Sequence, residues 1–338
     1  MGKNAHDIII SSHGDGGLLS HQLLQEIFLP CFNNEWLQEQ GDAALVSFNG
    51  QKLAMTTDSF VVSPLFFKGG DIGKLAVCGT VNDLVVSGAR PLWLSAAFIL
   101  PAGMEKSELK KVVQSMQETA NSLNLPIVTG DTKVVDSGNP SNLFINTTGI
   151  GSVYPQARFH PAYIKPGDVV IVSGSVGDHG AAILAERLQF TGEKTPTSDC
   201  APLTRLAEKL KPFYGGIRVM RDPTRGGLAT TLIELAAAGA VDLLLEESKI
   251  YVKPEVSAIA DILGVDPYYL ASEGRALIIA EATVASNIVE ALKTVPGAEE
   301  SSMIGAAREG DGSIYLHTRL GGTRRLRMLS GTPLPRIC

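Results

Sequence analysis

Aspartates stand at both ends of a short segment that the sequence predicts to be a β-hairpin. Two apolar stretches, 42–48 and 52–58, flank Asn49-Gly50, the strongest short-range signal for a two-residue hairpin turn. The start of the first strand then lies beside the end of the second, so Asp42 and Asp58 meet at the open end, about one residue out of direct register. Neighbouring carboxylates repel unless a cation lies between them, and Mg²⁺ held by carboxylates and phosphates would satisfy this pair. The alternative is that the two aspartates are solvated separately.

Two further aspartates occur where a ligand would be expected. A helix is predicted from Asp71, a suitable N-cap, to Gly88. Asp83 lies in its apolar stretch, where an isolated charge is costly unless it is paired or binds an ion. Residues 127–129 are predicted to form a short buried strand that delivers Asp131 at its end. We hypothesise that all four aspartates converge on one Mg²⁺ site.

Two glycine-containing segments precede predicted helices and suit an anion. Residues 13–17 form a glycine-rich turn before a helix that starts at Leu18, and such a turn presents free N–H groups. A flexible loop is an equal alternative. In segment 221–227, Arg221 and Arg225 stand at the N-terminus of a helix that runs to Gly239, which would attract phosphate. The alternative is two surface arginines that fix a loop.

The chain ends on Leu334-Pro335-Arg336-Ile337-Cys338, a segment with little apolar surface to bury. Prolines fix φ and bias the preceding residue toward extended backbone, so this segment is predicted to be a stiffened arm. A thiol at its tip could be loaded at one place and delivered to another. The alternative is an inert terminal cysteine. The other three cysteines are widely spaced, which indicates reduced thiols and excludes a disulfide framework or a zinc motif.

The composition is that of a globular protein with two domains. The chain has 338 residues, a formal net charge of −6 and 44% hydrophobic residues. The acidic balance argues against a nucleic-acid surface, and no apolar run approaches the roughly 20 residues of a membrane span. The N-terminus lacks the apolar core of a signal peptide, so a cytoplasmic location is expected.

The remaining pattern predicts an α/β (α+β) protein. Strands are expected over 90–100, 143–153, 168–173, 241–246 and 275–280, with two more around Gly310-Asp311-Gly312. Helices are expected over 105–123, 181–188 and 284–294, and the Pro-containing stretch 155–166 marks a boundary. Four segments follow: an N-terminal arm with the glycine-rich loop (1–40), an N-terminal ATP-binding α/β domain (41–155), a C-terminal α/β domain (156–325) and a flexible tail (326–338).

The motifs together resemble a known superfamily. Segments 41–44, 57–59, 69–71, 82–83, 130–132 and 222–227 are similar to the ATP-binding superfamily of aminoimidazole ribonucleotide synthetase. Segments 78–84, 146–151, 177–180 and 335–338 resemble, within it, the HypE family of hydrogenase maturation factors. The resemblance covers essentially the whole chain. It implies a two-domain aminoimidazole ribonucleotide synthetase-like fold and a homodimer built through the sheets of the N-terminal domains.

The resemblance also implies an activity. In that family a HypF-type partner loads a carbamoyl group onto the terminal cysteine sulfur. ATP then phosphorylates the amide oxygen, a base removes the remaining N–H protons and phosphate leaves. The product is a thiocyanate, whose cyanide goes to the iron of a nickel–iron hydrogenase precursor held by HypC and HypD. Amide oxygen is a poor leaving group, so its phosphorylation is a reasonable activation.

Roles can then be assigned to residues of this sequence. Cys338 would carry the substrate, Glu273 would be the base with His179 as a weaker candidate, and Lys133 would supply positive charge. Asp42, Asp58, Asp83 and Asp131 form the candidate Mg²⁺ set. The candidate ATP-binding residues are Gly16, Gly17, Asp42, Asp58, Asn82, Asp83, Asp131, Thr132 and Arg225.

Three alternatives remain open. Selenophosphate synthetase and thiamine monophosphate kinase resemble this chain in fold and acidic motifs. The former typically has a reactive Cys or selenocysteine near its N-terminal glycine loop, which residues 13–17 lack, and neither explains a terminal Pro-Arg-Ile-Cys. The third alternative is a non-catalytic carrier whose thiol only ferries a group.

Overall fold

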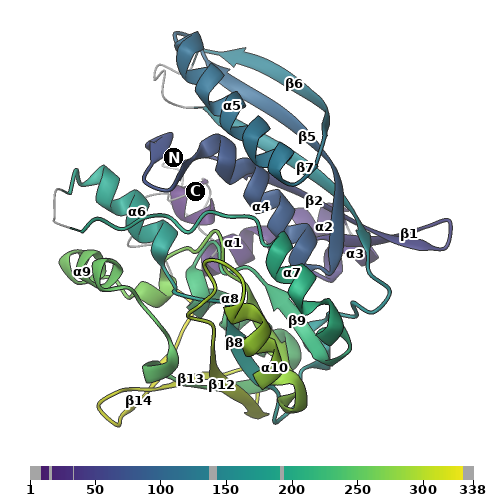
Figure 1. The fold of residues 1–338 in the computed structure, drawn as a ribbon, viewed down its shortest axis with the longest axis vertical. Helices are drawn as coiled ribbons and strands as arrows, with labels where there is room; N and C mark the ends of the chain where they lie inside the picture. The colour runs from purple at the N-terminus through teal and green to yellow at the C-terminus, as the bar shows by residue number, and fades with distance from the viewer. Residues whose placement is uncertain (1–8, 15–16, 33, 137–142, 191–193, 330–338) are drawn as a thin grey trace, which may run out of the picture.

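A computed structural model describes residues 9–14, 17–32, 34–136, 143–190 and 194–329 (Figure 1). Two main β-sheets divide these residues between an N-terminal and a C-terminal half. The N-terminal half carries a five-stranded sheet in the order β1-β2-β7-β5-β6, and the C-terminal half a seven-stranded sheet in the order β14-β13-β10-β12-β8-β11-β9. The α/β architecture expected from the sequence is therefore confirmed.

The predicted hairpin opens the five-stranded sheet. Strands β1 (Ala44–Phe48) and β2 (Gln51–Phe60) pair antiparallel around Asn49-Gly50, with Ala44 opposite Met55. Both turn residues have positive φ, at 49° and 78°, as the favoured two-residue turn requires. The sheet continues with β7 (Phe144–Val153), β5 (Ala89–Pro101) and β6 (Ile127–Val135).

Helix α4 (Ile72–Val86) lies across the sheet and packs on β2 and β7. It begins where predicted, because the Asp71 carboxylate accepts hydrogen bonds from the N–H groups of Gly73 and Lys74. It ends before Gly88, which has a φ of 77°. Helix α5 (Lys106–Ser122) packs beside α4, so this face of the sheet is covered (Figure 1).

The expected short buried strand at 127–129 is wrong in both length and burial. Strand β6 runs through Val135, and all nine of its residues are exposed. It pairs parallel with β5 at the edge of the sheet, and within the described part of this chain no strand pairs with its outer side. Asp131 therefore lies within a strand and not at its end.

The C-terminal half contains elements that the sequence pattern predicted and others that it missed. Expected strands appear as β8 (Val169–Val172), β10 (Val241–Glu246), β11 (Leu277–Ala280), β12 (Ser302–Glu309) and β13 (Ile314–His317), and expected helices as α6 (Asp178–Arg187), α8 (Gly227–Gly239) and α10 (Ala282–Lys293). The missed elements are α7 (Thr204–Leu210), β9 (Ile217–Arg221), α9 (Pro254–Leu263) and β14 (Thr323–Leu326). Strand β9 matters most here, because it delivers Asp222.

One hydrophobic cluster joins the two halves. It includes Ile72 and Leu75 on α4 together with Ile171, Leu210 and Met220 of the C-terminal half, each at most 2% exposed. A shared core of this kind fixes the relative position of residues contributed by the two sheets. Asp83 of α4 is thus held at a constant distance from Asp222, which follows β9.

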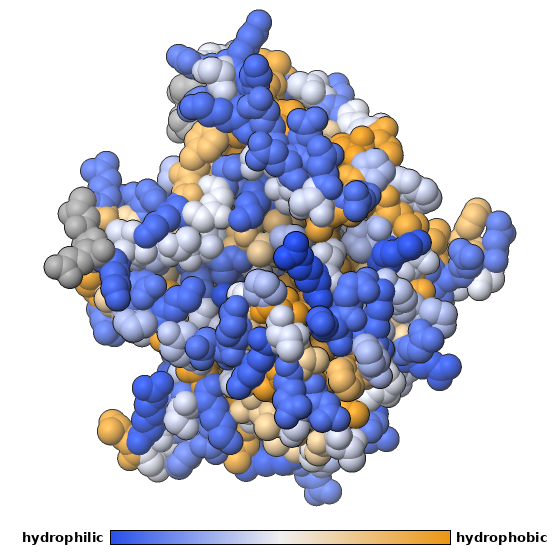
Figure 2. All heavy atoms as spheres, viewed as in Figure 1, coloured by the Kyte–Doolittle hydropathy of each residue, from blue (hydrophilic) through white to orange (hydrophobic). Residues whose placement is uncertain are grey.

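The remaining described segments lie on the surface. The N-terminal segment contains the short helices α1 (Leu18–Leu23), α2 (Leu29–Phe32) and α3 (Glu35–Gln38). No helix among the described residues is long and apolar enough to span a bilayer. Figure 2 shows that hydrophilic side chains dominate one face of the molecule, with apolar groups gathered at the upper right margin beside the strands β5 and β6 of Figure 1.

Candidate active site

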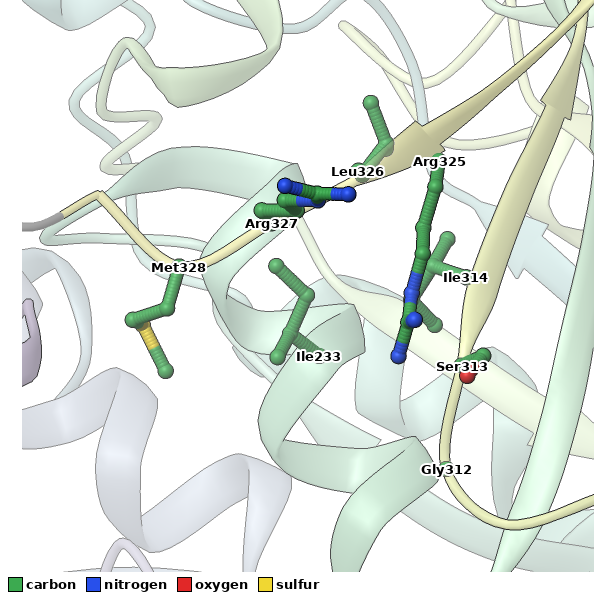
Figure 3. Close-up of a pocket in the computed structure, with 8 residues that line it drawn as sticks. All are labelled: Ile233, Gly312, Ser313, Ile314, Arg325, Leu326, Arg327 and Met328. Carbon is green, nitrogen blue, oxygen red and sulfur yellow. The ribbon is translucent and has the colours of Figure 1, made fainter.

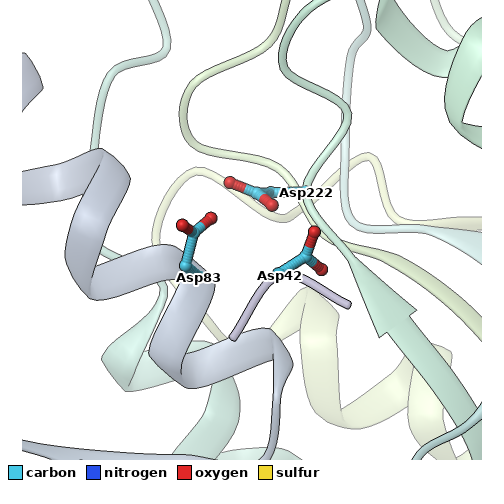
Figure 4. A group of neighbouring side chains, drawn as sticks. All are labelled: Asp42, Asp83 and Asp222. Atoms are coloured by element: carbon cyan, nitrogen blue, oxygen red, sulfur yellow. The ribbon is translucent and has the colours of Figure 1, made fainter. Parts of the chain in front are cut away.

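Three carboxylates from three separate parts of the fold form the centre of the candidate site. Asp42 lies two residues before β1, Asp83 projects from α4 and Asp222 directly follows β9, and the three side chains point toward one another (Figure 4). One carboxylate oxygen of each lies within 4.8 Å of the others. The predicted approach of Asp83 to Asp42 is confirmed, whereas Asp222 was not included in the predicted ligand set.

Burial makes this cluster electrostatically unfavourable by itself. Desolvation raises the pKa of Asp42 to about 6 and that of Asp222 to about 8, and the pKa of Asp83 is raised well above its ordinary value for the same reason. Arg221 partly compensates, because its Nε lies 2.7 Å from Oδ1 of Asp42. Three converging carboxylates with hard oxygen donors fit a divalent cation such as Mg²⁺.

Asp58 lies close to this cluster, on β2. Burial raises its pKa and the positive charge of Arg225 opposes that rise, while the charge of Asp58 in turn raises the pKa of Asp83. Arg225 also donates from Nη1 to the carbonyl oxygen of Gly14 at 3.2 Å. The glycine-rich loop, the arginine turn (residues 221–227) and the acidic cluster are therefore neighbours. A site that binds an anion together with its metal ion needs such groups close to one another.

Glu273 is buried beside the same cluster. Its side chain is 3% exposed, and its pKa is raised well above the ordinary value, first by desolvation and then by Asp222, Asp199 and Asp58. A buried carboxyl group with a raised pKa is a stronger base, once ionised, than an ordinary glutamate, so Glu273 is suited to proton transfer.

The backbone around Glu273 is held from two sides. The Asp199 carboxylate accepts the N–H of Glu273 at 3.1 Å and the N–H of Gly274 at 3.3 Å. Asn82, one helix residue before Asp83, donates to the carbonyl oxygen of Glu273 at 3.2 Å and to that of Ala201 at 3.1 Å. Asn82 is fully buried and acts here as a support for this loop, so its direct contact with a nucleotide stays a prediction.

Asp199 is itself part of a buried ionic network. Its Oδ2 lies 3.6 Å from Nε of Arg275, whose Nη2 lies 3.3 Å from Oδ2 of Asp178, and Lys253 approaches the same Asp178 oxygen at 2.8 Å. No spacing in the sequence indicated this network, because its members come from four segments that meet only in the folded chain.

His179 occupies a different environment from Glu273. It is fully buried near the start of α6, its Nδ1 lies 2.8 Å from Oγ of Ser198, and its ring meets that of Phe67 edge-to-face at 5.3 Å. It therefore packs at the junction of the two halves, and a catalytic role for it stays a prediction.

Asp131, Thr132 and Lys133 are not brought to the cluster within the chain. Asp58 pairs with Thr147, Thr147 with Ala96, and Ala96 with Gly130. Three strand spacings separate β2 from β6, or roughly 14 Å. Lys133 instead pairs with Asp131, Nζ to Oδ2 at 3.4 Å, and both side chains are exposed. Two other predicted site residues, Gly16 and Cys338, lie outside the described residues, as does most of the predicted tail.

Comparison with known proteins assigns the family. The N-terminal domain of AIR synthase related protein matches residues 40–153, and its C-terminal domain matches residues 165–317. Over 328 residues, 96% of this chain and 93% of the relative, the sequence is 44% identical to "Carbamoyl dehydratase HypE" of Cupriavidus necator. The chain belongs to the HypE family. The family resemblance inferred from the motifs is thereby confirmed.

Solved structures agree with this assignment. A HypE chain in a "HypE-HypF complex" superposes with a TM-score of 0.86 at 41% identity, covering 91% of this chain and 99% of that one. A HypE structure "in complex with ATP" superposes with a TM-score of 0.82 at 42% identity, covering 98% of this chain and all of that one. The expected aminoimidazole ribonucleotide synthetase-like fold is confirmed. The segment 222–227 carried part of the resemblance, so its first residue, Asp222, was the available signal for the third carboxylate.

Proposed function

We propose that this chain is an ATP-dependent carbamoyl dehydratase that converts an S-carbamoyl group on Cys338 to a thiocyanate. The observation that carries the proposal is the buried position of Glu273, with a raised pKa, beside the acidic cluster. The similar chain from Cupriavidus necator bears the name carbamoyl dehydratase, and the HypE structure with ATP supports nucleotide binding by this chain.

The residues around the acidic cluster suit a nucleotide with Mg²⁺. Asp42, Asp83 and Asp222 would hold the ion with help from Asp58, and Arg225 with the N–H groups near Gly17 would face the phosphates. When bound, Mg²⁺ would neutralise charge on the phosphates during phosphoryl transfer. The protein's own contribution is to position both reactants and exclude water from Glu273.

The chemistry requires one phosphoryl transfer and one elimination. The carbamoyl oxygen attacks the γ-phosphorus of ATP and releases ADP, which turns a poor leaving group into a phosphate ester. Two N–H protons are lost, the C–O bond breaks, and the product is the S–C≡N group with inorganic phosphate. Glu273 would accept a proton from nitrogen, and its raised pKa makes it a better base once it is ionised.

Two sets of partners complete this function. The HypE–HypF complex supports a HypF-type carbamoyltransferase as donor. The Cys338 thiol is free for another cycle only after the cyanide has left, so an acceptor must take the cyanide from the thiocyanate. A HypC–HypD complex that carries the iron of a nickel–iron hydrogenase is the proposed acceptor.

A homodimer through the five-stranded sheet is also proposed. The face away from α4 exposes Met55, Trp93 and Ile99, which are 50%, 47% and 44% exposed. Asp131 pairs with Ala97 and Lys133 with Ile99, so both residues lie on this same face. A second copy would bury the apolar side chains and place Asp131 and Lys133 at the interface, where they could complete a nucleotide site.

Mass spectrometry of protein carbamoylated at Cys338 tests the proposal. Addition of ATP is expected to remove the mass of one water from the C-terminal peptide, and Cys338→Ala is expected to accept no carbamoyl group. A carbamoylated peptide that keeps its mass with ATP would make the chain a carrier. The family match does not favour the selenophosphate synthetase or thiamine monophosphate kinase alternatives.

A further inference from the structure

The last described residues, Arg327 to Leu329, are fixed to the body of the protein. Strand β14 ends at Leu326, and Figure 3 shows Arg327 and Met328 where the chain leaves the strand and passes over α8, which carries Ile233. Met328 and Ile233 line a pocket of about 290 Å³ with residues of β13 and β14. The root of the terminal segment therefore has a defined place.

Tyr269 makes the most specific contact with this root. Its hydroxyl donates to the carbonyl oxygen of Arg327 at 2.8 Å and accepts from the N–H of the same residue at 3.3 Å. One side chain thus satisfies both polar groups of one residue's backbone. Nearby, Asp266 pairs with Arg324 of β14 at 2.7 Å, so the turn that contains Tyr269 is fixed to the strand as well.

The same turn is packed against the candidate active site. Gly227, at the start of α8, lies so close that an added Cβ would be 2.5 Å from the carbonyl oxygen of Leu270 and 2.7 Å from that of Tyr268. Ser272 donates its N–H to the carbonyl oxygen of Pro223 at 2.9 Å. Tyr269 therefore lies between the arginine turn (residues 221–227) and the segment 270–274, which carries Glu273.

A second contact joins the root to the glycine-rich loop. The N–H of Leu18 donates to the carbonyl oxygen of Leu329 at 3.3 Å, and a Cβ on Gly17 would lie 2.9 Å from that oxygen. Arg225 bonds the other side of the loop through Gly14. The root thus touches the glycine-rich loop, which Arg225 contacts in turn.

We infer that Tyr269 is a positioning residue that anchors the terminal arm at Arg327 and so delivers Cys338 to the active site. The inference rests on the proposed function. Nine residue steps separate Leu329 from Cys338, a reach of at most roughly 30 Å. An anchored root confines the thiol to a small volume around the site, which raises its effective concentration there without any new contact to the reacting atoms.

Tyr269→Phe removes the hydroxyl and keeps the ring. In a single-turnover assay of carbamoylated full-length protein, we expect the dehydration rate at saturating ATP to fall about 3- to 10-fold, the range expected for the loss of a net hydrogen bond. The ATP concentration that gives half the maximal rate is expected to stay the same. Tyr163→Phe, at an exposed tyrosine in the connection between the halves, is the matched control and is expected to match wild type in both measures.

Hydrogen exchange separates anchoring from a general structural effect. Amides of residues 326–329 are expected to exchange faster in Tyr269→Phe, whereas those of residues 270–276 keep their wild-type rates. An unchanged dehydration rate, or faster exchange across 270–276, would overturn the inference. Wild-type protein that loses no water with ATP would overturn the proposed function instead, so the two failures are distinguishable.

Discussion

The Asp199 carboxylate accepts the backbone N–H of Glu273 at 3.1 Å, and the same carboxylate faces Arg275 at 3.6 Å. The orientation of the candidate base is therefore set by a buried acid that comes from a loop more than 70 residues earlier in the chain. Such a support matters because a small displacement of a reacting group can cost a large factor in rate.

Asp199→Asn is expected to slow dehydration without weakening ATP binding. The amide keeps one acceptor oxygen but loses the charge that pairs with Arg275, so the loop that carries Glu273 becomes less well defined. A decrease of roughly 10- to 100-fold in the single-turnover rate is expected. Asp261→Asn on the exposed face of α9 is the control. If Asp199→Asn raised the half-saturating ATP concentration by the same factor as it lowered the rate, a role confined to Glu273 would be contradicted.

The raised pKa of Glu273 predicts how the reaction depends on pH. Burial and the surrounding carboxylates favour the protonated form, which cannot act as a base. The dehydration rate should therefore keep increasing with pH well above the range in which an ordinary glutamate ionises, and level off once Glu273 is ionised. Glu273→Gln keeps the shape, and it should lower the rate by roughly 10²- to 10⁴-fold and abolish the rise. If the dehydration rate of Glu273→Gln depended on pH in the same way as that of wild type, a group other than Glu273 would be the base.

The acidic cluster predicts a pH-dependent stability with a definite sign. The pKa of Asp222 is about 8 in the folded chain, against 3.8 ordinarily, so the folded state keeps a proton that the unfolded state releases between these values. Stability without divalent cations should therefore fall as pH rises from about 4 to about 8.

Asp222→Asn tests this sign directly. The variant is expected to melt roughly 3–5 °C higher than wild type at pH 8 without divalent cations, and close to wild type at pH 4. Addition of Mg²⁺ at pH 8 should raise the melting temperature of wild type more than that of the variant. A lower melting temperature for Asp222→Asn at pH 8 would show that the cluster is not under electrostatic strain.

The exposed face of the five-stranded sheet predicts a dimer that a single charge should disrupt. Sedimentation is expected to report a dimer for wild type. Trp93→Asp places a carboxylate among the apolar side chains of this face, and this variant is expected to sediment as a monomer. Leu320→Asp, at a residue that is 99% exposed outside this face, should leave the dimer intact. A monomeric wild type, or a dimeric Trp93→Asp, would contradict the proposed interface.

Local sequence signals predicted those features that neighbouring residues determine. The turn at Asn49-Gly50 and the cap at Asp71 both depend on a few adjacent residues, and both appear as expected. The burial of strand β6 was predicted wrongly, because an apolar sequence does not distinguish a buried strand from an exposed strand at the edge of a sheet. Asp222 was not included because the strand before it was not recognised.

The support for Glu273 could not have been predicted from the chain alone. Asp199 and Asn82 reach it from separate segments, and only the packing of α4 against the C-terminal half brings them together. The contact of Tyr269 could not have been predicted either. Its partner Arg327 is 58 positions away, and the hydrogen bond is to the backbone, which any residue type would provide.

The fate of the carbamoyl oxygen tests the central claim most directly. If Cys338 carries a carbamoyl group labelled with ¹⁸O, phosphorylation on that oxygen must transfer the label to phosphate when the C–O bond breaks. We predict one labelled oxygen in each inorganic phosphate released during a single turnover with ATP. Label that appears in water, with unlabelled phosphate, would contradict activation of the carbamoyl oxygen by ATP.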